Sequence, residues 1–331
     1  MVYWPRPQHR ETMIKKSTAL LLLWLSISCI HNTVADYTEF IGASGVVRKG
    51  DELLIVSDKD PGAYYRYPLA NNRGPLITID SSQLVRVPMP GASLAMDLES
   101  IEILADGRVV GLSEQLSALV SEKGVVAEYG GPFSELAGIG TEGVAVRPLE
   151  DGSSRVAILW EGGYPEFEKL PIQLRGIIAQ GALMPVFLVH DILNGQNYGK
   201  IRFNLVNQVR LQVPTPKGKG PSAQRFRASD LVWHKWKNQG KEEWGFIVLL
   251  NSKNLARPPQ YMYDELLRFD LKGHPVGKML DLNTLFPKEL QHLNWEGLGW
   301  FEEGESLVLV FDNSADQAPA AFVVKLPEDW K

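Results

Sequence analysis

One pattern occurs four times in this chain and restricts how it can fold. Each copy has an opening acid, a short apolar segment, a turn or loop containing Gly with Asp or Glu, a second apolar segment and a closing carboxylate or amide. The copies are DLESIEILADGRVVGLSEQ (97–115), TEGVAVRPLEDGSSRVAILWEGG (141–163), SDLVWHKWKNQGKEEWGFIVLLNS (229–252) and NWEGLGWFEEGESLVLVFDNS (294–314). Two apolar segments joined in this way predict an antiparallel β-hairpin. A hairpin returns to the sheet end where it began, so both polar residues of each copy are expected at the same end.

A weaker fifth copy, GASGVVRKGDELLIVSD (42–58), has Ser44 at the opening position and closes with Asp58. The interval between the openers Glu142 and Asp230 is about twice the usual one, which predicts a degenerate unit near 183–192 (LMPVFLVHDI). Strand-rich repeats of this period are typical of a β-propeller and do not suit a pair of β-sandwiches. The expected fold class is therefore all-β, a β-propeller with six blades.

The remaining strands fit this expectation. AYYRYPLA (63–70) and ELLRFDLKG (265–273) each follow a closing polar residue and are predicted to be third strands of blades. AAFVVKLP (320–327) ends a blade that lacks an outer strand, and the segment after Asp36 could supply it. Residues 36–331 are thus expected to form a single propeller domain.

The first 35 residues have the features of an export signal. Lys15 and Lys16 precede an apolar run, Thr33-Val34-Ala35 offers small residues for cleavage, and Met13 is an alternative start. The apolar run is short for a membrane span, so no transmembrane span is expected in the mature chain. The expected location is the periplasm or the outside of the cell. Lipid attachment at Cys29, the only cysteine, is an alternative.

Charge narrows the possible partners. The formal net charge is −5 and the sequence shows no basic face, which argues against nucleic acid, because phosphate binding needs clustered Lys and Arg. The nearest basic run, PTPKGKGPSAQRFR (214–227), is interpreted as a solvated loop. The four histidines within 190–292 lack the spacing of a zinc site.

The acidic set is the candidate site. Its members, with one amide, are Asp58, Glu99, Glu114, Glu142, Glu161, Asp230, Asn251, Glu296 and Asp312. The first strand of each propeller blade lines the central channel, so the openers are expected to converge there. Carboxylates around one axis repel one another, and a hard cation such as Ca²⁺ would relieve that repulsion. The alternative interpretation is that each acid caps backbone N–H groups of the neighbouring blade and binds no metal.

These phrases also resemble the blades of the phytase-like proteins, the "esterase-like activity of phytase" family. The resemblance covers most of 40–326. It rests on the segments DLESIEILADGRVVGLSE, TEGVAV, SDLVWH and NWEGLGWFEEGESLVLVFDN. It implies a secreted or periplasmic propeller that hydrolyses phosphoric esters with calcium. The sequence departs from the family pattern at Ser100, at Asp230-Leu231 and at Asn251, and it lacks the dense Asp/Lys/Arg cluster that grips a polyphosphorylated sugar.

Two functions follow as hypotheses. In the first, the chain is a metal-dependent hydrolase of small-molecule esters or phosphoesters, and Glu114 acts as the base. Its expected Ca²⁺ ligands are Glu99, Glu142, Glu296, Asp312 and Asp58. Its candidates for holding an anionic group are Arg66, Arg147 and Arg268. In the second, the chain is a non-catalytic envelope propeller that binds a ligand or a protein partner and uses the acids as architecture.

Overall fold

The computed structural model describes residues 40, 42–60, 62–69, 74–89, 97–130, 140–161, 185–198, 200–202, 209–214, 227–253, 261–291, 293–313 and 317–331. Contacts divide the chain into Met1–Thr38 and Glu39–Lys331, and all described residues lie in the second unit. The predicted leader (1–35), with Met13 and Cys29, lies outside the described residues. Within the described part, no helix is long and apolar enough to cross a membrane.

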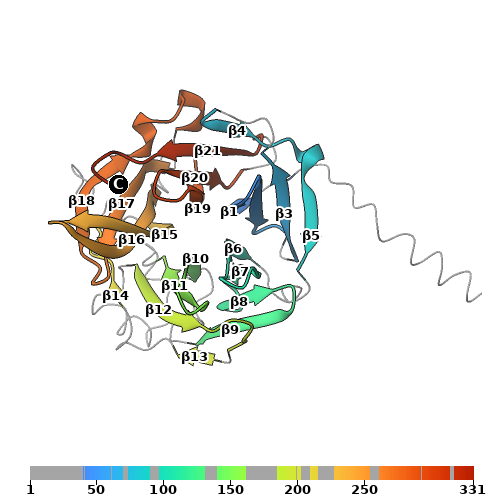
Figure 1. Ribbon diagram of the computed structural model, residues 1–331. Helices are drawn as coiled ribbons and strands as arrows, with labels where there is room; N and C mark the ends of the chain where they lie inside the picture. The colour runs from blue at the N-terminus through green and yellow to red at the C-terminus, as the bar shows by residue number, and fades with distance from the viewer. Residues whose placement is uncertain are drawn as a thin grey trace, which may run out of the picture. The chain divides into compact units, whose positions relative to one another are not determined.

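The described residues of 40–331 form an all-β propeller whose sheets are arranged around one axis (Figure 1). Blade 1 contains β1 (Ala43–Lys49), β2 (Glu52–Ser57), β3 (Ala63–Pro68) and β5 (Val85–Pro88). Blade 2 contains β6 (Leu98–Ile103), β7 (Val109–Ser113), β8 (Ala118–Ser121), β9 (Gly124–Gly130) and β13 (Lys200–Arg202). Blade 3 contains β10 (Thr141–Pro148), β11 (Ser154–Trp160), β12 (Val186–Ile192) and β14 (Val209–Arg210).

The last two blades complete the ring. Blade 4 contains β15 (Arg227–Asn238), β16 (Lys241–Lys253), β17 (Tyr261–Asp270) and β18 (Pro275–Asp281). Blade 5 contains β19 (Trp295–Glu302), β20 (Ser306–Phe311), β21 (Ala320–Lys325) and β4 (Leu76–Thr78). The short 3-10 helices are η1 (Ser81–Gln83), η4 (Leu282–Thr284) and η5 (Lys288–Leu290). The described chain thus has five blades.

The prediction of six blades was therefore wrong. The segment near 183–192 is not a degenerate unit, because 186–192 is β12, the third strand of blade 3. The long interval between the openers of blades 3 and 4 contains long connections and β13, a strand that pairs with β9 of blade 2. Loop length costs little free energy, so spacing alone miscounts blades. The five hairpins expected from the sequence are all present, as β1–β2, β6–β7, β10–β11, β15–β16 and β19–β20.

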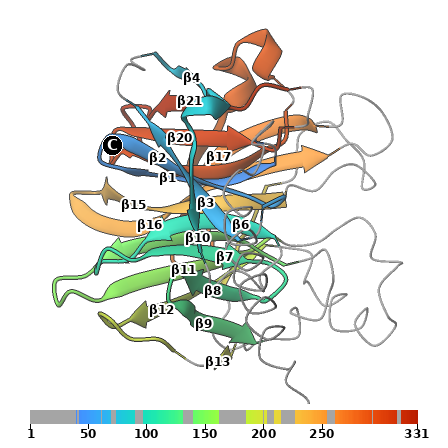
Figure 2. The ribbon, with the colours of Figure 1, turned by 90° about the vertical axis from the view of Figure 1, so that its right-hand side faces the viewer.

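The ring closes through a strand that comes early in the chain. β4 pairs antiparallel with β21, with Ile77 opposite Ala321. The last blade does lack an outer strand of its own, as expected, but the strand that completes it is Leu76–Thr78 and not the segment directly after Asp36. Figure 2 shows β4 beside β21 at the edge of the ring.

Apolar side chains of neighbouring blades pack together in every interface. Within the described residues they form five buried clusters, one for each pair of neighbouring blades. Alternate residues of one strand serve both neighbours: Leu53 of β2 packs against Val308 of blade 5, and Leu54 packs against Val120 of blade 2. Successive side chains of a strand point to opposite faces of the sheet, and here both faces are buried. This explains why the strand sequences are almost continuously apolar.

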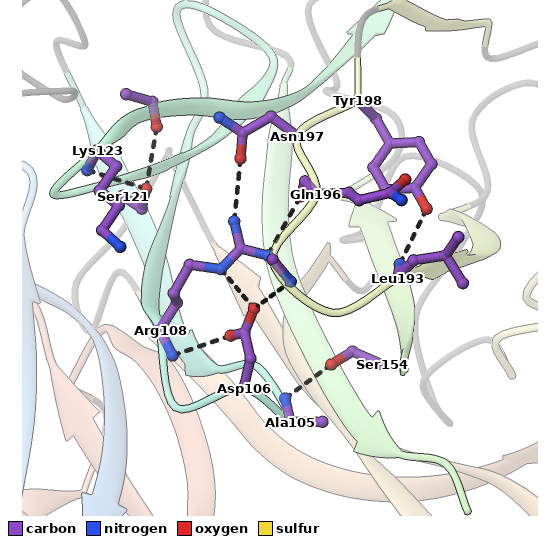
Figure 3. A network of polar contacts seen from close by, with 12 residues as sticks. Ala105, Asp106, Arg108, Ser121, Lys123, Ser154, Leu193, Gln196, Asn197 and Tyr198 are labelled. Carbon is purple, nitrogen blue, oxygen red and sulfur yellow. Dashed lines mark hydrogen bonds and ion pairs between the residues drawn. The ribbon is translucent and has the colours of Figure 1, made fainter. Parts of the chain in front are cut away.

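A polar clamp joins blades 2 and 3 at the end of the ring away from the hairpin openings (Figure 3). Arg108 Nε donates to Asp106 Oδ2 at 2.7 Å, and its Nη1 donates to Asn197 Oδ1 at 3.0 Å. The backbone N–H of Gly195 also donates to Asp106 Oδ2, at 2.9 Å. The Asp106 and Arg108 side chains are only 10% and 14% exposed. This ion pair therefore contributes more to stability than a solvent-exposed pair would.

Candidate functional site

The opening residue of each hairpin occupies a one-residue β-bulge at the start of the inner strand. The bulges leave one residue unpaired in each of β1, β6, β10, β15 and β19. The unpaired residues are Ser44, Glu99, Glu142, Ser229 and Glu296. A bulge re-aims a side chain relative to the ladder, so five equivalent side chains are turned in the same way at one end of the channel.

The register corrects the assignment of Asp230. Asp230 was predicted to be an opener, whereas Ser229 occupies the bulge and Asp230 is one residue further in. Asp230 is fully buried; its Oδ2 accepts from the N–H of Leu298 at 2.8 Å, and its Oδ1 accepts from Ser100 Oγ at 3.2 Å. Burial raises its pKa well above the usual range. This carboxyl links blade 4 to blades 5 and 2 inside the ring, which is the architectural use expected under the alternative interpretation.

The closing residues are held by a repeated backbone hydrogen bond. The N–H groups of Asp58, Glu114, Glu161 and Asp312 each donate to the carbonyl of the residue two positions before the opener of the same hairpin. These distances are 3.1, 3.0, 3.4 and 2.9 Å. Opener and closer therefore lie at the same end of each of these blades, at the start of the inner strand.

Two glycines make room for closing carboxylates. A Cβ on Gly42 would overlap the carboxylate of Asp58, and a Cβ on Gly140 would overlap the side chain of Glu114. Gly42 also has a φ of +68°, which favours glycine. Gly140 has no such backbone requirement, so the space for Glu114 is the reason for a glycine there.

The carboxylates at this end of the ring interact with one another. Burial raises the pKa of Glu99 well above the usual range, and repulsion from Glu296 and Glu114 raises it further. Burial likewise raises the pKa of Glu142, with added repulsion from Glu161. We call this cluster the acid mouth. Its members are Asp58, Asp97, Glu99, Glu114, Glu142, Glu161, Glu296 and Asp312.

Glu114 has the pKa best suited to proton transfer at neutral pH. Burial, with repulsion from Glu161 and Asp97, raises the pKa of Glu114 to about 7, and Arg227 partly offsets the rise. A carboxyl group with a pKa near the ambient pH can both accept and release a proton. Perturbed carboxyls of this kind gather at functional sites, although buried structural networks produce them as well.

Two cations lie within the acid mouth, and the sequence analysis assigned neither to it. Arg227 forms an ion pair with Glu161, with Nε 2.7 Å from Oε2, and the two side chains are 11% and 0% exposed. Arg227 also lowers the pKa of both Glu114 and Glu142. Lys59 pairs with Asp58. The sequence signal for Arg227 was present, because it ends the basic run at 214–227 and directly precedes the third hairpin.

Other polar positions near the mouth are tied into the blades. Asn251 is fully buried, and its Nδ2 donates to Ser229 Oγ at 2.7 Å and to the Trp295 carbonyl at 3.0 Å. Asn294, also missed by the sequence analysis, donates to Glu296 and, at 3.4 Å, to Asp312 Oδ2. Each amide joins an opening segment to a closing one, and Asn251 also connects blade 4 to blade 5.

The donor chemistry of the acid mouth suits a hard cation. A dication would offset the repulsion that raises the pKa values of Glu99 and Glu142, and Asp58 Oδ1 is buried without a hydrogen-bond partner in the described part of the chain. The carboxylate side chains are not arranged as the ligands of a metal ion. Among the described residues, no three His, Cys, Asp or Glu side chains are grouped closely enough to hold one metal ion. Binding would require some of these side chains to rotate.

The three arginines considered for an anionic group lie elsewhere. Arg66 makes a bidentate ion pair with Glu52, at 2.9 and 2.7 Å, at the start of β2. Arg147 is five residues along β10 from Glu142, which places it roughly 16 Å from the mouth. Arg268 stacks over Trp330, with its guanidinium carbon 5.1 Å from the ring centroid.

Comparisons with known proteins add the following. No family model matches the chain, and no curated protein matches it. Solved structures similar to it include virginiamycin B lyase from Staphylococcus aureus, with 10% identity over 88% of this chain and 97% of that chain and a TM-score of 0.36. The calcium-binding protein regucalcin from Agrobacterium tumefaciens has 10% identity over 88% and 94%, with a TM-score of 0.39. An endo-arabinase from Bacteroides thetaiotaomicron has 10% identity over 87% and 95%, with a TM-score of 0.43. Likenesses at this level support no argument about activity, so the phytase-like resemblance stays a prediction.

Proposed function

We propose that this chain is a hydrolase of small-molecule esters, phosphoesters included, whose active site is the acid mouth, and that the mouth takes up a divalent cation such as Ca²⁺. The observation that carries the proposal is the mutual repulsion of Glu99, Glu142 and Glu296 at the end of the channel. The proposed leader, residues 1–35, would deliver the protein to the periplasm or out of the cell.

The residues of the mouth have separable roles. Glu114, with a pKa of about 7, takes the proton from an attacking water and returns it to the leaving oxygen. Arg227 offers a positive charge beside Glu114 that stabilises the oxyanion formed on attack. The residues that would hold the cation are Asp58, Glu99, Glu142, Glu296 and Asp312. When bound, the cation offsets the negative charge of the mouth and polarises the ester oxygen.

A second function is favoured by one observation. Asp230 and Asn251 hydrogen-bond to backbone groups of neighbouring blades, so part of the acidic set is architecture. A propeller with a rigid, negatively charged mouth would bind a cationic ligand or a basic protein segment without turnover.

The first experiment measures cation binding. The melting temperature of residues 36–331 is followed with increasing Ca²⁺, for the wild type and for Glu142→Gln combined with Glu296→Gln. At a free concentration of about 100 times Kd, a single site adds about 2.7 kcal/mol. For a chain of this size that corresponds to a rise of roughly 4 °C. The double variant should lose the rise, and an equal rise in both proteins would contradict the proposed cation site.

The second experiment measures turnover of p-nitrophenyl acetate and p-nitrophenyl phosphate, with and without Ca²⁺. Glu114→Gln should lower kcat about 100-fold or more, because general acid–base catalysis typically contributes about 10²–10⁴. Glu150→Gln, at an exposed turn, is the matched control and should retain full activity. Cation binding without turnover of either ester would favour the binding propeller.

A further inference from the structure

A second pocket lies between blades 3 and 4, away from the acid mouth. Its volume is about 330 Å³, at the lower end of the range for small-molecule sites. It is lined by strands β10, β11, β12 and β14 of blade 3, by β15 and β16 of blade 4, and by the turn that follows β17 (Figure 1). The side chains that matter are Arg147, Arg155, Phe187, Trp233, Trp244 and Leu271.

Arg147 is the distinctive group in this pocket. Its guanidinium carbon lies 4.0 Å from the ring centroid of Trp244 and 4.9 Å from that of Trp233. Its Nε is buried and has no hydrogen-bond partner in the described part of the chain. The stacking holds the guanidinium by its face and leaves the Nε–H without an acceptor among the described residues.

In the described part of the chain, Asp191 acts on this charge from a distance and makes no hydrogen bond to Arg147. Asp191 is engaged by Arg155, which donates to both carboxylate oxygens at 2.7 and 2.8 Å. Burial lowers the pKa of Arg147 and repulsion from Arg155 lowers it further, while attraction to Asp191 offsets part of the fall. Among the described residues, Asp191 is bound by Arg155, so the Arg147 guanidinium is only partly compensated.

Apart from Arg147 and the Arg155 side chain, which is paired with Asp191, the lining of the pocket is apolar and preformed. Phe187 and Trp233 are 1% and 4% exposed, and the indole N–H of Trp233 donates to the Ala145 carbonyl at 3.2 Å, which fixes the ring. Leu271 is 45% exposed at the rim, where a ligand could cover it. Fixed aromatic walls favour a flat ligand, because the protein loses little side-chain entropy on binding.

We propose that this pocket binds a small organic carboxylate with a flat apolar body, whose carboxylate pairs with Arg147 and whose body lies against Trp244 and Trp233. A carboxylate matches the fork of a guanidinium edge. Inorganic phosphate fits poorly, because it would exchange its hydration for one guanidinium and apolar walls. The pocket is independent of the acid mouth and of the hydrolase proposal.

The test uses 2-naphthoate as the probe, titrated calorimetrically into residues 36–331. The expected Kd is roughly 0.1 mM, an ordinary affinity for a ligand of this size. The neutral analogue 2-naphthylmethanol should bind at least about tenfold more weakly, because it cannot form the charged pair. Acetate and inorganic phosphate, which lack the apolar body, should show no binding in this range.

Variants locate the site. Arg147→Met should weaken 2-naphthoate binding at least about tenfold. The affinity of Arg147→Lys should lie between those of the wild type and Arg147→Met, because lysine keeps the charge and loses the forked geometry of the guanidinium. Arg66→Met, which removes an arginine from blade 1, is the control and should bind as the wild type does. The proposal is overturned if Arg147→Met binds 2-naphthoate like the wild type, or if the neutral analogue binds as tightly as the acid. The second comparison uses the wild type alone, so it stands even if Arg147→Met does not fold.

Discussion

Replacing Glu114 by glutamine should stabilise this protein above pH 7. The pKa of Glu114 is raised from 4.5 to about 7 by burial and by repulsion from Glu161. Between those two values the folded protein binds more protons than the unfolded chain, so the free energy of unfolding falls as the pH rises. Below pH 4.5 the group is neutral in both states and has no such effect.

The size of the effect follows from the same shift. Each pKa unit corresponds to about 1.4 kcal/mol, so full expression of the rise would destabilise the folded protein by about 3 kcal/mol at pH 8. Glu114 is not fully enclosed, and solvent screening reduces this figure to about 1–2 kcal/mol. Glu114→Gln should therefore gain about 1–2 kcal/mol at pH 8 and almost nothing at pH 4, with a rise in melting temperature of roughly 2–3 °C at the higher pH.

The assay is urea unfolding followed by tryptophan fluorescence at a series of pH values from 4 to 8.5, without divalent cations. Glu150→Gln, on an exposed turn, serves as the matched control and should follow the wild-type curve. A Glu114→Gln protein that is less stable than the wild type at pH 8, or whose stability changes with pH in parallel with the wild type, would refute the electrostatic account of the acid mouth.

Three further predictions concern the architecture around the site. Asp230→Ala leaves two buried donors, the N–H of Leu298 and the hydroxyl of Ser100, without this acceptor. The free energy of unfolding in urea should fall by about 2–5 kcal/mol, and a fall of less than about 1 kcal/mol would contradict the role of Asp230 in linking the blades. Gly140→Ala should cost about 1–3 kcal/mol because its Cβ overlaps Glu114, and the double variant with Glu114→Ala should recover most of the loss; additive losses would exclude that overlap as the cause. Burial lowers the pKa of His234 to about 4, so this residue removes stability as the pH falls from 6.5 to 4; His234→Phe should flatten that part of the melting-temperature profile, and an unchanged slope would count against the assignment.

The sequence predicted the hairpins well because the acid, strand, turn and strand order reflects local rules of burial and turn formation. It was less informative where a feature depended on a one-residue shift in strand register or on the length of a connection. Asp230 was taken as an opener because it is the acid nearest the expected position, whereas the bulge selects Ser229. The number of blades was wrong because spacing was read as periodicity, and β12 belongs to blade 3.

The composition of the acid mouth shows the same limit. Glu99, Glu142 and Glu296 were expected together because they occupy equivalent positions in their hairpins. Arg227 was interpreted as part of a solvated loop, since the sequence does not show that it faces Glu161 from the neighbouring blade. Contacts between residues far apart in the chain depend on how the blades are arranged around the axis, and one sequence gives no direct signal of that arrangement.

The pairing of β4 with β21 has a consequence for how the protein is made. β21 follows β4 by about 240 residues, so at roughly 5–20 residues per second the ribosome needs about 12–50 s to supply the partner. During that time β4 presents an unsatisfied edge, which is a site for pairing with other chains. A chain truncated before Ala320 never acquires the partner strand, and we expect it to aggregate or to be degraded. Because β4 and β21 pair in the last blade, synthesis must have passed β21 before the ring can close.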